Sequence, residues 1–101
     1  MTVDLYANEL VIKAGNTVKV VDNTRIPGKL IVTNQRVYFK ATDQVNESHN
    51  LEILPDNIEE VIFFGGLFKS KGINVVTTDG LNHPFPLKKR EEIGRLINSM
   101  Y

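Results

Sequence analysis

The sequence contains no cysteine and has no excess of charge of either sign. The absence of cysteine excludes disulfide bonds, thiolate metal sites and a cysteine nucleophile. Twelve basic side chains balance twelve acidic ones, so no strong long-range attraction draws the protein to nucleic acid or to an anionic membrane. Either contact would need a local patch of charge, and we expect no nucleic-acid partner.

Long hydrophobic runs are also missing. No apolar stretch approaches the roughly 20 residues of a membrane span. The first ten residues, MTVDLYANEL, carry two acidic side chains and no basic region ahead of an apolar run, unlike a secretory signal. We therefore expect a cytoplasmic protein, with peripheral membrane contact as an alternative. The 101 residues, 42% of them hydrophobic, suit a single packed domain over residues 1–101.

The usual signatures of catalysis are absent from the sequence. It has no Gly-x-Ser-x-Gly elbow, phosphate-binding loop or His-Glu-x-x-His motif. Ser48 and His49 are adjacent, and adjacent strand residues point to opposite faces, so they make a poor nucleophile and base pair. The two histidines, His49 and His83, lie far apart in the sequence. We therefore expect no enzymatic activity, no metal and no cofactor.

The most informative stretch covers residues 28–40, GKLIVTNQRVYFK. Two runs of strand-forming residues flank Asn34-Gln35, and two residues between alternating runs favour a tight hairpin. Arg36, Tyr38 and Lys40 share one face of this hairpin. Stacking of arginine on tyrosine is expected there, on a face that would by default be exposed.

The rest of the chain predicts further strands at 9–21, 51–54, 58–64, 72–78 and 81–87, separated by loops at 22–28 and 41–49. Asp79-Gly80 is a strong hairpin signal. Pro84 and Pro86 cannot donate to a ladder, so the strand that contains them should lie at an edge.

The last segment changes to a helical period. Its apolar residues recur at helical spacing and form one stripe, at Ile93, Leu96, Ile97 and Met100. Gly94 lowers helix stability by roughly 1 kcal/mol relative to alanine, so tight packing should hold it. About seven short strands followed by one helix predict a mainly β sandwich or barrel, capped by the C-terminal α-helix.

Four stretches together resemble GRAM and bacterial PH-like domains of the PH superfold: residues 9–12, 28–40, 53–61 and 73–85. The resemblance implies a seven-stranded PH-like fold with a closing helix, and a non-catalytic module that binds proteins or lipids. One feature departs from the family. PH domains that hold phosphoinositides usually cluster basic residues around the loop between the first two strands, whereas Lys19, Arg25 and Lys29 are widely spaced around Asp22.

Apolar residues crowd around Gly65-Gly66, where one strand face cannot absorb them all. They suit a homo-oligomer contact made by Phe64, Leu67 and Phe68. With Lys69 and Lys71 behind them, they also suit a tip that touches a membrane. A third interpretation is that the loop folds back and packs all of them internally.

The densest basic run, Lys88-Lys89-Arg90, is followed at once by Glu91-Glu92. This order favours a solvated helix start over a nucleic-acid patch. The sequence therefore predicts a module for protein interaction or self-association. The alternative is a peripheral membrane or lipid-binding module, including phosphoinositide binding, that uses the anionic-lipid candidates Lys19, Arg25, Lys29, Lys69 and Lys71.

Overall fold

The computed structural model describes residues 4–66 and 69–101. This part of the chain forms seven strands, two short 3-10 helices and one α-helix. Their order is β1 (Val11–Val21), β2 (Thr24–Thr33), β3 (Val37–Ala41), η1 (Gln44–His49), β4 (Leu51–Ile53), η2 (Pro55–Asn57), β5 (Ile58–Gly66), β6 (Lys69–Thr77), β7 (Asn82–Pro86) and α1 (Arg90–Asn98).

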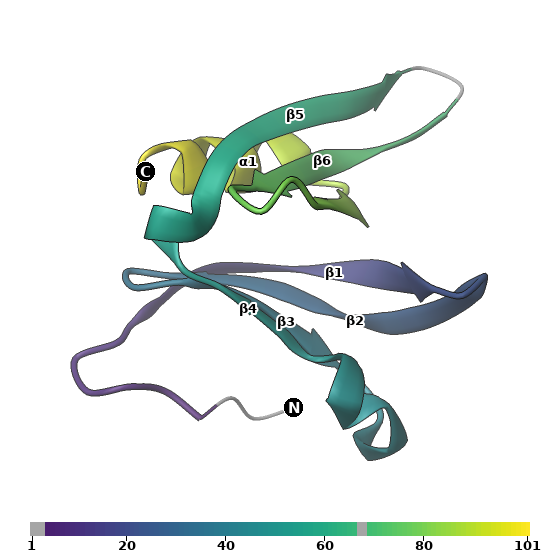
Figure 1. Cartoon of the computed structure of the whole chain (residues 1–101), viewed down its shortest axis with the longest axis horizontal. Coiled ribbons are helices and arrows are strands. Elements are labelled where there is room, and N and C mark those ends of the chain that lie inside the picture. The colour runs from purple at the N-terminus through teal and green to yellow at the C-terminus, as the bar shows by residue number, and fades with distance from the viewer. Residues whose placement is uncertain (1–3, 67–68) are drawn as a thin grey trace.

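The strands form two antiparallel sheets that lie one above the other (Figure 1). One sheet has the order β1-β2-β3-β4 and the other β5-β6-β7. Where β1 approaches β7, the Thr17 hydroxyl donates to the Pro86 carbonyl at 2.6 Å, but the two strands belong to different sheets. The fold is therefore a sandwich rather than a closed barrel, and the predicted mainly β class with one C-terminal helix is confirmed.

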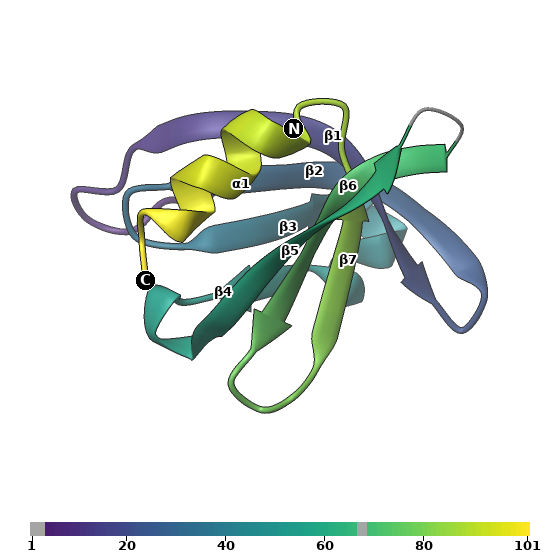
Figure 2. The ribbon, with the colours of Figure 1, turned by 90° about the horizontal axis from the view of Figure 1, so that it is seen from above.

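The core lies between the inner faces of the two sheets. Phe39 and Phe85 stack across it with ring centroids 5.8 Å apart. Helix α1 closes one side (Figure 2). It contributes Ile93 and Ile97, both fully buried, with Leu96 and Met100 packed partly against the core. The predicted apolar stripe is confirmed.

Gly94 sits in this helix because the aromatic ring of Phe63 occupies the place of a side chain. A Cβ atom at residue 94 would collide with two carbon atoms of that ring. The helix propensity lost at glycine is thus offset by close contact between α1 and β5, as the sequence suggested.

The predicted loop at 22–28 is wrong. β2 begins at Thr24, and only Asp22 and Asn23 connect it to β1, with φ values of 50° and 65°. Positive φ at both positions is the geometry of a two-residue hairpin turn, which asparagine and aspartate tolerate. Pro27 is accommodated in β2 because pairing with β3 starts only at Gly28. Likewise, β5 continues through Gly66 instead of stopping before the two glycines.

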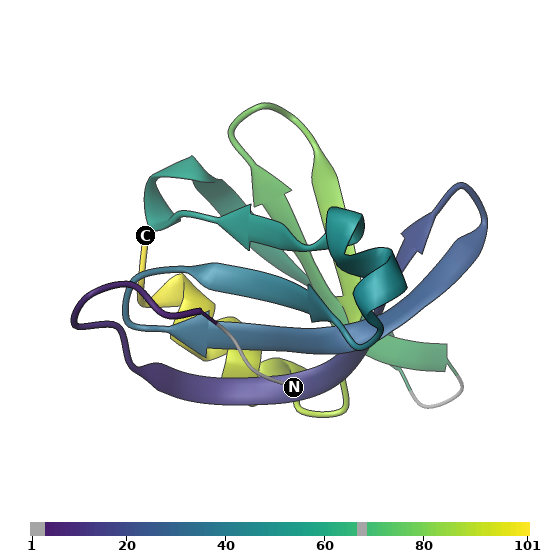
Figure 3. The ribbon, with the colours of Figure 1, turned by 90° about the horizontal axis from the view of Figure 1, so that it is seen from below.

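The N-terminal segment, residues 4–10, crosses the outer face of the four-stranded sheet (Figures 1 and 3). On this sheet, Ile31, which pairs with Tyr38, and Arg36 are each only 4% exposed. The prediction of an exposed face around Arg36 is therefore wrong, because a segment distant in sequence covers it.

Candidate functional site

Arg36 is the centre of the most elaborate polar network in the described part of the chain. Its guanidinium donates to both carboxylate oxygens of Glu9, at 2.8 and 3.1 Å, to Glu52 at 2.7 Å and to the Asp4 carbonyl at 2.8 Å. The guanidinium carbon also lies 4.1 Å from the ring centroid of Tyr6 and 4.7 Å from that of Tyr38. The expected stacking of arginine on tyrosine is present, with two tyrosine rings in contact with the guanidinium.

The turn between β2 and β3 fastens the N-terminal segment along its length. The Thr33 hydroxyl donates to Glu9 at 2.6 Å. The side-chain amides of Asn34 and Gln35 donate to the carbonyls of Asn8 and Ala7, at 3.1 and 2.8 Å. The Thr-Asn-Gln-Arg stretch, which is part of the family resemblance, therefore holds the N-terminal segment against the sheet in this protein.

Glu9 is held in its ionised form inside this network. Burial alone would raise the pKa of the Glu9 carboxyl, but hydrogen bonds from Arg36, the Thr33 hydroxyl and the Tyr6 amide outweigh it and lower the pKa to about 2. Because its charged groups are already bonded to one another, this network is an anchor for the N-terminal segment rather than a ligand site.

A basic groove lies where β1, β7 and the start of α1 meet. Two adjoining hollows, of about 320 and 380 Å³, share Asn16, Leu87 and Lys88. Lys71 lines the first and Lys29 and Lys89 line the second. We call this surface the lysine groove, formed around Asn16 by Lys29, Lys71, Lys88 and Lys89.

The fold brings these lysines together from three segments of the chain. Lys29 pairs with Asn16 across β1 and β2, Lys71 lies on β6, and Lys88 and Lys89 follow β7. The Lys71 carbonyl accepts a hydrogen bond from the Leu87 amide at 2.8 Å, which fixes β6 against the segment that carries the other two lysines.

The groove keeps a positive charge although acidic residues follow it in sequence. Glu92 binds Lys13 at 2.7 Å, so one of the two nearby glutamates is already paired. Among the described residues, none of the four groove lysines forms a salt bridge. The solvated helix start predicted from Lys88-Lys89-Arg90 is thus one wall of a basic surface. The sequence alone does not reveal this basic surface, because Glu92 pairs with Lys13, which lies 79 positions away.

The basic residues predicted near the first loop do not converge. Lys19 turns inward and donates to the His49 carbonyl at 2.9 Å, and burial lowers the pKa of its ammonium group. Arg25 is exposed near the β1–β2 turn and lies four residues from Lys29 along β2, a separation of about 13 Å. Of the lipid-binding candidates, Lys71 and Lys29 each line one of the two adjoining hollows, while the side chain of Lys69 lies outside the described residues.

Of the three residues predicted to mediate self-association, the structure describes Phe64. Leu67 and Phe68 lie outside the described residues. Phe64 is half-buried on the outer face of the three-stranded sheet, where its ring lies against Gly72. Ile62 is 43% exposed and shares this face, which no other element of the described chain crosses (Figure 2).

Two further properties bear on function. The described residues contain no group of three or more His, Cys, Asp or Glu side chains that could hold a metal ion. In the same part of the chain, the helices lack the length and apolar character needed to cross a bilayer.

Comparison with known proteins concerns the fold. No family model matches this sequence, and a comparison with curated proteins finds no match. Among solved structures, the C-terminal domain of an unknown protein from Leishmania infantum has a TM-score of 0.78 and 19% identity, covering 93% of this chain and 85% of that one. The Vps36 N-terminal PH domain has a TM-score of 0.68 and 16% identity, covering 95% and 84% respectively.

The chain has a PH-like fold. At these identities the likeness concerns the fold and not the ligand. The resemblance read from residues 28–40 and the other three stretches is confirmed at this level, and the narrower likeness to GRAM domains stays a prediction. On this PH-like fold, the lysine groove and the outer face of the three-stranded sheet are two surfaces that the rest of the described chain leaves uncovered.

Proposed function

We propose that this protein is a non-catalytic binding module that attaches to anionic phospholipid surfaces through the lysine groove. One observation carries the proposal: Lys29, Lys71, Lys88 and Lys89, from three segments, line adjoining hollows around Asn16. PH-like domains are generally binding modules, which agrees with this function. The groove replaces the first-loop cluster that phosphoinositide-binding relatives usually carry and that this chain lacks.

The expected attachment is weak and reversible. Each lysine near an anionic surface contributes about 1 kcal/mol, so four contribute about 4 kcal/mol, which corresponds to a dissociation constant near 1 mM. Leu67 and Phe68 lie outside the described residues, so their predicted insertion into a membrane stays a separate prediction.

Co-sedimentation with vesicles tests this function. Binding to vesicles that contain phosphatidylserine should exceed binding to pure phosphatidylcholine, and it should fall as salt rises because salt screens the lysines. The double variant Lys88→Gln/Lys89→Gln should lose most of the binding. A matched control, Arg25→Gln/Arg95→Gln, removes the same charge from exposed positions elsewhere and should bind nearly as well as wild type. Equal loss in both variants would show that only net charge matters and would refute the groove.

A second candidate is self-association through the outer face of the three-stranded sheet. Ile62 is 43% exposed there, beside the half-buried Phe64 and Val76 and with Glu60 opposite Val76 at the margin. An apolar patch with charge at its rim is typical of an interface. The occupant we propose is a second copy of the chain. Light scattering should then show a dimer that Ile62→Asp converts to monomer, whereas a wild-type protein that stays monomeric at high concentration would refute it.

A further inference from the structure

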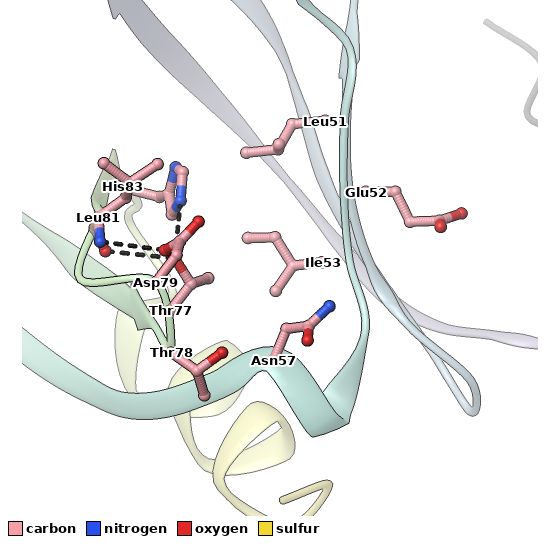
Figure 4. Close-up of a pocket in the computed structure, with 9 residues that line it drawn as sticks. All are labelled: Leu51, Glu52, Ile53, Asn57, Thr77, Thr78, Asp79, Leu81 and His83. Carbon is pink, nitrogen blue, oxygen red and sulfur yellow. Dashed lines mark hydrogen bonds between the residues drawn. The ribbon is translucent and has the colours of Figure 1, made fainter.

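A third cleft lies at the opposite end of the three-stranded sheet from the lysine groove. It has a volume of about 300 Å³ and opens between β4 and the β6–β7 turn. Figure 4 shows Leu51 and Ile53 on one wall, with Thr77, Asp79 and His83 facing them from the other. We call this the mouth cleft.

One wall of the mouth cleft is apolar. Ile53 is buried and Leu51 half-buried, and both side chains leave β4 toward the cleft (Figure 4). Glu52, between them, points the opposite way (Figure 4) and binds Arg36 at 2.7 Å. Its carboxylate is therefore used elsewhere, and the β4 wall presents hydrocarbon alone.

The other wall presents hydrogen-bond acceptors and one negative charge. Asp79 Oδ1 accepts hydrogen bonds from the Thr77 hydroxyl and from the Leu81 amide, the latter at 3.1 Å. Those bonds lower the pKa of the Asp79 carboxyl, which is therefore ionised at neutral pH. Its second oxygen, Oδ2, accepts no hydrogen bond among the described residues. The carboxylate is thus held in place with one oxygen available.

No protein cation neutralises this carboxylate among the described residues. His83 lies beside it, with Nε2 3.3 Å from the Thr77 hydroxyl. Burial has the largest effect and lowers the pKa of the His83 imidazole, while the charge of Asp79 acts to raise it and that of Lys19 to lower it. The ring is therefore neutral at pH 7. The ammonium of Lys19, on β1, is directed to the His49 carbonyl. From η2, Asp56 is exposed and does not line the cleft.

We propose that the mouth cleft receives a lysine or arginine side chain of a protein partner. The aliphatic stem would lie along Leu51 and Ile53, and the cationic head would bind the free oxygen of Asp79. Basic side chains suit such a site because an apolar stem carries a charged end. A cleft of about 300 Å³ lies at the lower end of the range for ligand pockets, so it suits one side chain. Asp79 disfavours an anionic ligand at the same position.

This binding is separate from the proposed attachment to lipid. Lys71 in the groove and Thr77 in the cleft are six residues apart on β6, a separation of about 20 Å. A domain bound to a bilayer through the lysine groove would direct the mouth cleft toward the other end of the sheet, where a protein partner can reach it. The two proposals rest on different residues and can fail independently.

Titration by NMR tests the cleft, with Nα-acetyl-lysine amide and Nα-acetyl-arginine amide as probes. Saturable shifts should appear at the amides of residues 51–57 and 77–83. The neutral isostere Nα-acetyl-norleucine amide should bind about tenfold more weakly or worse, because a hydrogen bond to a charged group contributes more than apolar contact alone. Asp79→Asn keeps an oxygen acceptor for the turn and should reduce binding of the cationic probes to the norleucine level.

Asp56→Asn is the matched control, since it removes an exposed carboxylate that does not line the cleft, and it should bind both probes like wild type. Equal binding of norleucine and lysine probes would make this an apolar pocket and overturn the proposal. An equal loss in both variants would indicate non-specific attraction and would also overturn it, as would the absence of saturable shifts. Vesicle binding should be unchanged in Asp79→Asn, so failure of the groove and failure of the cleft are distinguishable.

Discussion

Replacing Arg36 with methionine should be among the most destabilising single changes in this protein. Methionine keeps an apolar stem near Tyr6 and Tyr38 but removes the guanidinium that binds Glu9 at 2.8 and 3.1 Å. The side chain of Glu9 has no exposed surface and that of Arg36 is 4% exposed. The variant therefore leaves an ionised carboxylate in a dry site without its partner.

The cost follows from that burial. Breaking a buried ion pair by removing one member destabilises a protein by about 3–5 kcal/mol, a large part of the roughly 5–15 kcal/mol that stabilises a typical domain. For a domain of this size each kcal/mol moves the melting temperature by about 4–8 °C, so Arg36→Met should lower it by at least about 12 °C. The exposed Arg25→Met is the matched control and should change it little.

Urea unfolding followed by circular dichroism measures the loss. The double variant Glu9→Gln/Arg36→Met should recover part of it, because the buried charge is gone while hydrogen bonds to Thr33 are kept. If the segment detaches without global unfolding, the Leu10 amide hydrogen, which donates to Asn34 Oδ1 at 2.8 Å, should exchange faster with solvent. A loss below about 1 kcal/mol with unchanged exchange at Leu10 would refute the anchoring role.

Three other predictions follow from the same structure. The pKa of Glu9 falls from 4.5 to about 2 on folding, so its ionisation stabilises the protein above about pH 4.5. This contribution is lost as pH falls toward 2, and urea midpoints should drop less steeply over this range in Glu9→Gln than in wild type. Gly28→Ala should cost about 1–3 kcal/mol, because its Cβ would meet the Lys40 carbonyl and lie 2.7 Å from Phe39 Cζ; full stability would contradict that contact. Ile97→Ala should cost about 2–5 kcal/mol, since Ile97 is fully buried, and an unchanged melting temperature would argue against capping by α1.

Local patterns in the sequence were enough to predict most of the architecture. Alternation over residues 28–40 predicted the β2–β3 hairpin, and Asp79-Gly80 predicted the turn before β7. The apolar spacing of the last segment predicted α1 and its buried face. These features depend on neighbours within a few positions, because turn conformation and strand or helix period are set by short stretches of chain.

The surfaces relevant to function required the tertiary structure. Arg36 is buried only because Glu9, 27 positions away, is brought onto the same face by the N-terminal segment. The lysine groove exists because Lys29, Lys71 and Lys88 come from different segments, and because Lys13 pairs with the Glu92 that would otherwise offset them. Charges act through distance in space and through burial, neither of which follows from separation along the chain. The sequence by itself therefore determined the strands, the turns and the helix, and the packing of the two sheets decided where charge is paired and where it is left open to a partner.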